Sequence, residues 1–188
     1  MSDSVALTGE PLALDLVNTR PADGDLLTSP GELRAWLGLE ADRFPEAAEL
    51  AAGQLGAPEL AAVREIRDHA ARALDRARRG ARPAAGDLAA LNAAQRAAPA
   101  IGELGWDGEA VAVTHRRTGP ARARLAAWLA EAAAGLLADP RVTEVRACEA
   151  EDCVLLFLPA HPRRRWCSAA RCGNRVRVAR HYRRHRPG

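Results

Sequence analysis

The stretch CEAEDCVLLFLPAHPRRRWCSAARC, residues 148–172, contains all four cysteines of the 188-residue chain. They form two pairs of equal spacing, Cys148-x4-Cys153 and Cys167-x4-Cys172, separated by thirteen residues. Each pair can close a tight loop that offers two sulfurs about 2.3 Å from one metal ion, and the chain between the pairs is long enough for a short hairpin. Four soft thiolates favour a single structural Zn²⁺, with iron as the alternative occupant.

Other interpretations of these cysteines stay open at the level of sequence. The four thiols can be buried or redox-active without metal, or a Cys3His site can use His161, His181 or His185. A catalytic zinc normally keeps an open position with three protein ligands, whereas four cysteines close the shell. No nucleophile–base pair and no phosphate-binding loop stands out elsewhere, so we expect a protein that is not an enzyme.

The charge of the chain changes sign close to the cysteines. Residues 1–160 hold 17 Arg against 24 Asp and Glu, while residues 161–188 hold 10 Arg and no acid. Four thiolates around Zn²⁺ leave a charge near −2, which ten arginines greatly exceed, so several of them are available for a polyanion. Nucleic acid is favoured over acidic lipid as that partner. The candidate contacts are Arg163, Arg164, Arg165, Arg171, Arg175, Arg177, Arg180, Arg183 and Arg184.

The segment from about Ala170 onward is predicted to be a helix. Cys172, Val176 and Ala179 share one face that can pack on the metal lobe, and the other faces are rich in guanidinium. Such a helix can follow a phosphate backbone or enter a major groove. A solvated basic tail with only nonspecific affinity is the alternative.

The chain before the cysteines is predicted to be mainly helical. The clearest helix runs over residues 58–79 and ends at Gly80, and a capping box at Ser29 and Glu32 starts another. Residues 11–19 fit either a short strand or a helical turn. Further helices are expected over about 87–98 and 120–139, a hairpin over 101–117 and a strand over 142–147. The predicted fold class is therefore α+β, a mainly helical domain with a small antiparallel sheet followed by a zinc finger.

No basic segment followed by an apolar core opens the chain, and the longest apolar run, Leu125–Ala138, is broken by Glu131 and is too short to span a membrane. We therefore expect a cytoplasmic protein that is associated with the nucleoid when bound to DNA.

Two motifs resemble known families. Cys172-Gly173-Asn174-Arg175, preceded by Arg165-Trp166-Cys167-Ser168, is similar to the CGNR zinc finger, and Leu14-Asp15-Leu16-Val17-Asn18-Thr19 resembles the motif of the ABATE domain that precedes this finger in bacterial proteins. The resemblance implies a stress-associated transcription regulator with an ABATE-like domain over residues 1–143 and a treble-clef-like finger over 144–188. It also implies zinc ligation by Cys148, Cys153, Cys167 and Cys172.

The chain departs from these families at two places. Leu16 stands where Phe is common, and Leu158-Pro159-Ala160-His161 stands where an Asp is common after the aromatic residue. The first is a mild change in the core. The second concerns the loop between the cysteine pairs and does not affect the metal ligands.

Several polar and motif residues allow a structural and a functional interpretation. Gly173 and Asn174 are expected to build the finger, together with Trp166, because glycine lets the chain approach the metal loop and the Asn amide can bond to that loop. Arg175 can contact phosphate or pair with Asp152 or Glu151. Asp15 and Asn18 can line an effector site or tie a turn.

The sequence therefore predicts a DNA-binding transcriptional regulator with one structural Zn²⁺. The expected partners are double-stranded DNA, a second copy of the chain and a small-molecule effector, with the N-terminal domain as sensor or dimerisation module. One alternative is a zinc-stapled basic module that binds RNA or an acidic protein. A second is a winged-helix-type reader formed by helices 58–79 and 87–98 and the hairpin near 106–117.

Overall fold

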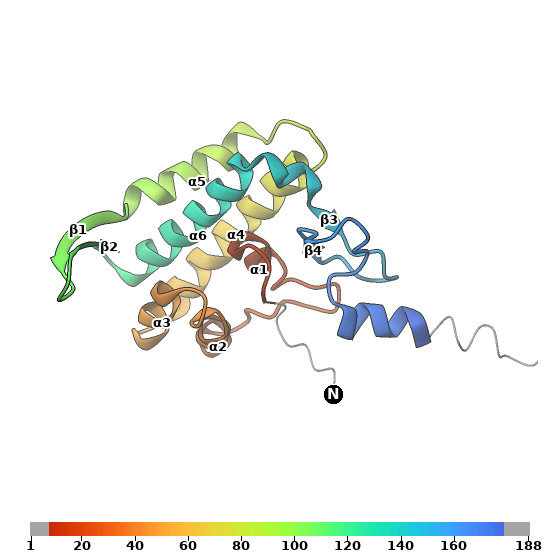
Figure 1. The fold of residues 1–188 in the computed structure, drawn as a ribbon, viewed down its shortest axis with the longest axis horizontal. Coiled ribbons are helices and arrows are strands. Elements are labelled where there is room, and N and C mark those ends of the chain that lie inside the picture. The colour runs from red at the N-terminus through yellow and green to blue at the C-terminus, as the bar shows by residue number, and fades with distance from the viewer. Residues whose placement is uncertain (1–7, 179–188) are drawn as a thin grey trace, which may run out of the picture.

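The computed structural model describes residues 8–178 and shows a helical body with a small finger at one end (Figure 1). The predicted α+β fold class is confirmed. The body contains α1 Leu12–Val17, α2 Pro30–Glu40, α3 Pro45–Ala52, α4 Ala57–Ala77, α5 Ala85–Ala97, the antiparallel strands β1 Ile101–Trp106 and β2 Val111–Arg116, and α6 Ala121–Ala138. The chain then continues through a 3-10 helix, Pro140–Glu144, into β3 Arg146–Ala147, β4 Leu156–Phe157 and a π-helical turn, Ala169–Gly173.

The long helix α4 forms because its apolar residues return to one face every three or four positions. Leu60, Val63, Ile66 and Leu74 are all buried there, against α6, α5 and α1. The helix ends before Gly80, whose φ of +69° lies in the left-handed region that stops a helix. The helix predicted over 58–79 is confirmed within two residues at either end.

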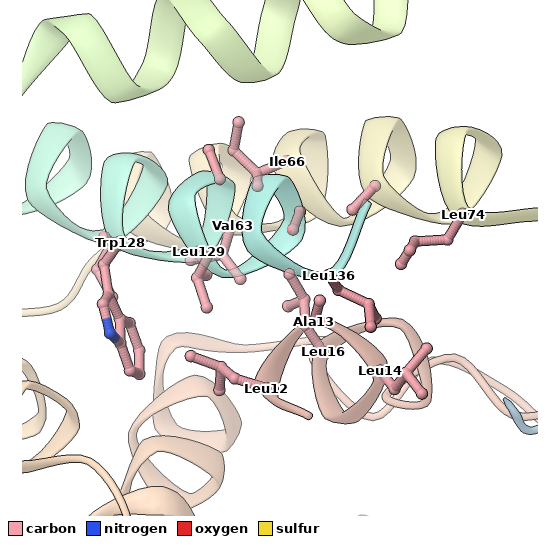
Figure 2. Packing of buried hydrophobic residues seen from close by; sticks show 14 of the residues in the cluster. Leu12, Ala13, Leu14, Leu16, Val63, Ile66, Leu74, Trp128, Leu129 and Leu136 are labelled. Atoms are coloured by element: carbon pink, nitrogen blue, oxygen red, sulfur yellow. The ribbon is translucent and has the colours of Figure 1, made fainter. Parts of the chain in front are cut away.

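The short helix α1 lies in the centre of the body, which explains why its sequence was ambiguous. Leu12, Leu14 and Leu16 are buried together with Ala13 between them, so the helix is covered on every side and shows no amphipathic period. Figure 2 shows its side chains beneath α6 and α4. Its contacts also reach β4, and α1 thus connects the helical core to the finger.

Of the remaining predictions for the body, the capping box and the hairpin are confirmed and one strand is wrong. The capping box of α2 is present, with Ser29 accepting from the backbone of Glu32 and the Glu32 carboxylate accepting from that of Ser29. The predicted hairpin is confirmed and extends over 101–116. The strand expected over 142–147 is wrong for most of its length, because Pro140 starts a 3-10 turn capped by Asp139 and only residues 146–147 pair. The helix α3 was not predicted.

Among residues 8–178, no helix combines the length and the apolar character that crossing a membrane requires.

Candidate metal centre

The first cysteine loop lies between the two short strands of the finger. Cys148 follows β3 directly, and its backbone N–H donates to the carbonyl of Leu155 at 2.9 Å. The loop turns back at Asp152, which has a φ of +62°, so that Cys153 lies next to Cys148. Asp tolerates this left-handed conformation better than most residues do. The four-residue spacer is thus closed by a single strained position.

The second cysteine loop is a wide helical turn. The Ser168 hydroxyl accepts from the backbone N–H of Arg171, and the N–H of Gly173 donates to the carbonyl of Ser168 at 3.0 Å, a bond that spans five residues. This π-type turn places Cys167 and Cys172 on the same side although four residues separate them. Both sulfurs therefore face the first loop.

The four sulfur atoms are arranged as donors to one ion. All four Sγ atoms lie within 4.8 Å of one another. The Cys153–Cys167 and Cys167–Cys172 sulfur distances are 3.9 and 3.6 Å. Tetrahedral ligation with Zn–S bonds of about 2.3 Å requires sulfurs about 3.8 Å apart. The donor set therefore fits one structural Zn²⁺ with no position left open.

Histidine ligands are not supported in the part of the chain that the structure describes. His161 does not join the cysteine cluster, which contains sulfur donors alone. His181 and His185 lie outside the described residues, as do Ala179, Arg180, Arg183 and Arg184.

The cysteine thiols lie in surroundings where their ionised form needs a nearby positive charge. Burial, and then the nearby Cys148 sulfur, raise the pKa of Cys153 to about 11. Burial also raises the pKa of Cys167, with its neighbours Cys172 and Cys153 adding to the effect. At Cys148, burial is outweighed by hydrogen bonds, the largest from the backbone N–H of Cys167, and the pKa is lowered. A dication is the charge that makes four thiolates stable in such a site.

A small apolar core surrounds the sulfurs and is separate from the core of the body. Phe157 and Leu155 are its largest buried members, and Trp166 and Val176 pack against it. Val176 belongs to the helical segment that continues from Gly173 to the last described residue. Because this cluster is small, the metal must contribute much of the finger's stability.

Asn18 fastens the finger to the body. Its amide nitrogen donates to the carbonyl of Leu156 and its amide oxygen accepts from the N–H of Leu156, both at 2.8 Å. Asn18 thus bonds to β4 as a neighbouring strand would, across 138 positions of sequence. Both polar atoms of the Asn18 side chain are hydrogen-bonded to Leu156, and this arrangement favours a structural role for Asn18 over a role in an effector site.

Asp15, the other candidate effector residue, also has its hydrogen-bond partners within the chain. Its carboxylate accepts from the backbone N–H groups of Gly9 and Glu10 and pairs with Arg43 at 2.6 Å. These bonds hold residues 9–10 across the start of α1. Burial raises the pKa of Asp15 to about 6, against the lowering effect of Arg43.

Glu10 forms a second connection between the body and the finger, which the sequence did not predict. One carboxylate oxygen accepts from the N–H of Leu158 at 2.9 Å, and the other pairs with Arg164 at 2.5 Å. Arg164 also donates to the carbonyls of Trp166 and Cys167, and its guanidinium lies 4.4 Å from the centre of the Phe157 ring. Arg164, a candidate DNA contact in the sequence, is thus held between the body and the metal loop.

The other described arginines of the finger are exposed. Arg165 pairs with Glu149 at 2.5 Å, Arg175 donates to the carbonyl of Glu151 at 2.7 Å, and Arg177 donates to Asn174. Arg163 and Arg171 are exposed as well.

The contacts of Gly173 and Asn174 differ from those that the motif suggested. A Cβ at Gly173 would meet Ser168 and Trp166 at 3.6 Å, an ordinary contact, so space alone does not require glycine there. Asn174 is exposed, and its side-chain oxygen accepts from Arg177, on the same helical segment, and not from the metal loop.

Comparison with protein families places two matches in succession along the chain. The ABATE family, described as "Putative stress-induced transcription regulator", matches residues 10–140. The CGNR zinc finger matches residues 144–185. A comparison with curated proteins finds no match.

Proposed function

Because the chain belongs to the ABATE family and ends in a CGNR zinc finger, we propose that it is a DNA-binding transcriptional regulator without catalytic activity. In this proposal the zinc-stabilised finger contacts duplex DNA, and the helical body controls the position of the finger. Residues 1–143 and 144–188 act as the two domains.

The observation that carries the proposal is the segregation of charge onto the finger. All ten arginines after residue 160 occur without a single acid, while the preceding chain is acidic. Arg163, Arg165, Arg171, Arg175 and Arg177 are exposed on the finger. Duplex DNA binds such a surface because each neutralised phosphate releases counterions. Arg164 is left out of the proposed surface, because its guanidinium is committed to Glu10 and the metal loop.

The test compares two variants that remove the same amount of charge. Arg175→Gln/Arg177→Gln removes two exposed arginines of the finger, and Arg82→Gln/Arg96→Gln removes two exposed arginines of the body. Duplex binding by the zinc-loaded protein is measured from 50 to 300 mM salt. The finger variant should weaken binding and reduce the salt slope by about 0.9 for each phosphate that is no longer neutralised, whereas the body variant should not. Equal effects in both variants would contradict the proposal.

The same titration addresses the alternative partners. Single-stranded RNA and an acidic peptide are compared with duplex DNA at one salt concentration. Tighter binding of the RNA or the peptide would favour a basic module with that partner over a DNA reader.

The structure gives little support to a winged-helix-type reader. The connection between α4 and α5 spans residues 78–84, and α5 packs along α6 as well as α4. The only basic residue of α5 is Arg96. A helix with a single guanidinium and two packed faces is poorly suited to a major groove.

We also propose that the body senses a ligand in a cavity beside α1. The cavity measures about 650 Å³, and its lining includes Leu12, Phe44, Trp128 and Leu136. Both arginines of the lining are paired with carboxylates, Arg117 with Glu46 and Glu131 and Arg141 with Asp139, so neither guanidinium is left for an anionic ligand. An uncharged apolar molecule is therefore the chemistry that this cavity favours.

The route from the cavity to the finger is short. Leu12 at the start of α1 lines the cavity, and Asn18 at the end of α1 holds β4. A shift of α1 by a ligand therefore moves the attachment point of the finger. In thermal-shift titrations with a panel of uncharged aromatic compounds, binders should raise the melting temperature of the wild type but not of Ala132→Phe, which fills the cavity. Shifts of equal size in both proteins would place the binding elsewhere.

A further inference from the structure

Two acidic side chains, those of Asp15 on α1 and Glu40 at the end of α2, are buried next to each other. Both have an exposed fraction of 0%, and both accept from the same atom, Nη1 of Arg43, at 2.6 and 2.9 Å. The Glu40 side chain also lies within hydrogen-bond distance of that of Asp15. One guanidinium therefore serves two buried carboxylates, and this group has a net charge of −1 when both acids are ionised.

One oxygen of this acidic pair has no donor in the described chain. Oε2 of Glu40 accepts from Arg43, whereas Oε1 is buried and has no hydrogen-bond partner among residues 8–178. Nearly all buried polar atoms in folded proteins have such a partner. A proton on the Glu40 carboxyl group, donated to Asp15, replaces the repulsion between two acids by a hydrogen bond.

The surroundings of the acidic pair also favour the bound proton. Burial, and then the Asp15 carboxylate, raise the pKa of Glu40 to about 7, and burial raises that of Asp15 to about 6. Other charged side chains on the neighbouring elements have partners of their own, and they are Arg64 and Arg67 of α4 with Asp25, Arg117 with Glu46 of α3 and Glu131 of α6, and Arg164 of the finger with Glu10. Among the described residues, Arg43 is thus the cation that bonds to the pair.

The bonds of the acidic pair extend to the finger through Glu10. Asp15 accepts from the backbone N–H of Glu10, and Arg43 donates to its carbonyl. The Glu10 carboxylate in turn accepts from the N–H of Leu158 and pairs with Arg164. A change within the acidic pair therefore acts on the residue that holds the finger.

We propose that Asp15 and Glu40 share one proton, and that this proton helps to hold the finger against the body. When the finger separates, residues 9 and 10 leave Asp15, water reaches both carboxylates and the proton is released to solvent. Separation therefore becomes easier as the pH rises from about 4, where an ordinary carboxyl group ionises, to about 7, and changes little above that. The proposal does not depend on DNA binding, because separation is measured without nucleic acid.

The first test is amide hydrogen exchange of the full zinc-loaded chain between pH 5.5 and 7.5, with each rate divided by that of the unfolded amide at the same pH. The Leu158 amide reports separation of the finger because it bonds to Glu10, and the Val63 amide in α4 reports unfolding of the body. The variant is Glu40→Gln, whose amide is neutral at every pH. Glu65→Gln, which changes an exposed carboxylate of α4, is the matched control.

Protection of the Leu158 amide should fall about tenfold over this range in the wild type and in Glu65→Gln, because separation releases a proton. In Glu40→Gln it should change less than about twofold, since no proton is released from residue 40. A wild type without this fall, or an equal fall in Glu40→Gln, would overturn the proposal. Equal protection at Leu158 and Val63 at every pH would also overturn it, because the finger then separates only when the body unfolds.

A titration of the wild type tests the shared proton without any substitution. The NMR signal of the Glu40 carboxyl carbon should move between pH 5.5 and 8, whereas that of Glu65 should already have its ionised value at pH 5.5. A Glu40 signal that has the ionised value throughout would show that the pair holds no proton, and the proposal would be wrong.

Discussion

The carboxylate of Glu10 and the guanidinium of Arg164 form an ion pair of 2.5 Å that joins the helical body to the metal loop. The side chain of Glu10 is 8% exposed and that of Arg164 is 28% exposed, so neither charge is well solvated. Arg164→Met keeps most of the apolar stem but leaves the Glu10 carboxylate buried without this partner. We expect the free energy of unfolding to fall by about 2–3 kcal/mol in urea denaturation.

A second substitution separates the charge from the packing. Glu10→Gln in the Arg164→Met background removes the unpaired carboxylate and should recover part of the stability. Arg163→Met, which changes an exposed neighbour, should alter stability by less than about 0.5 kcal/mol. If Arg163→Met lowers the free energy of unfolding as much as Arg164→Met does, the ion pair has no specific role in stability.

Asn18→Ala should destabilise the attachment of β4. The substitution leaves both backbone groups of Leu156 without their partner in a buried position, and each such group costs about 1–3 kcal/mol. Hydrogen exchange at the Leu156 amide should accelerate, together with a lower midpoint of unfolding. Asn92→Ala, at an exposed position of α5, is the control and should leave both quantities unchanged.

The purified chain should contain one zinc ion per molecule. Cys167→Ser should reduce the metal content to near zero, because the Cys167 sulfur lies against those of both Cys153 and Cys172. A chelator should remove part of the circular dichroism, since the small apolar cluster around the sulfurs cannot hold the finger without metal. Ser168→Ala removes a hydrogen bond to Arg171 but no ligand, so it should retain the zinc. A chelator that extracts the metal without any change in the spectrum would contradict a structural role.

The acidic pair Asp15 and Glu40 should make stability depend on pH. Burial, and then the nearby Asp15 carboxylate, raise the pKa of Glu40 to about 7, while burial raises that of Asp15 to about 6. The folded protein therefore binds more protons than the unfolded chain between about pH 4 and 7. Over that range these two groups lower the free energy of unfolding as pH rises, and the effect levels off above pH 7.

The matched comparison uses Glu40→Gln, because other carboxylates of the chain have lowered pKa values and act in the opposite direction. The difference in unfolding free energy between the wild type and Glu40→Gln should change by roughly 1–3 kcal/mol from pH 4.5 to 7.5, with the wild type becoming relatively less stable. A difference that does not vary with pH would show that Glu40 ionises normally in the folded state.

The sequence predicted the parts of the fold that depend on local chemistry. The capping box at Ser29, the face of α4 and the hairpin over 101–116 each follow from neighbouring residues. The equal spacing of the cysteines likewise predicted that their sulfurs meet, because each loop closes over a few residues. These features do not depend on how distant segments meet.

The features that the sequence missed depend on distant partners. The start of α1 is buried on every side, so the period that identifies a surface helix is absent there. Glu10 carried no motif, and its partner lies 154 positions away. Within Arg163-Arg164-Arg165, no local signal distinguishes the one guanidinium that lies over Phe157 from its two exposed neighbours.

The place of α1 also constrains how the protein is made. Helix α1 packs on α4, α6 and β4, so a ribosome must release residues up to 157 before Leu12, Leu14 and Leu16 find all of their neighbours. Until then part of the surface of these leucines remains open to solvent or to chaperones. Because the contacts of α1 with α6 and β4 are so distant in sequence, the body can close around α1 only after residues 121–157 have left the ribosome.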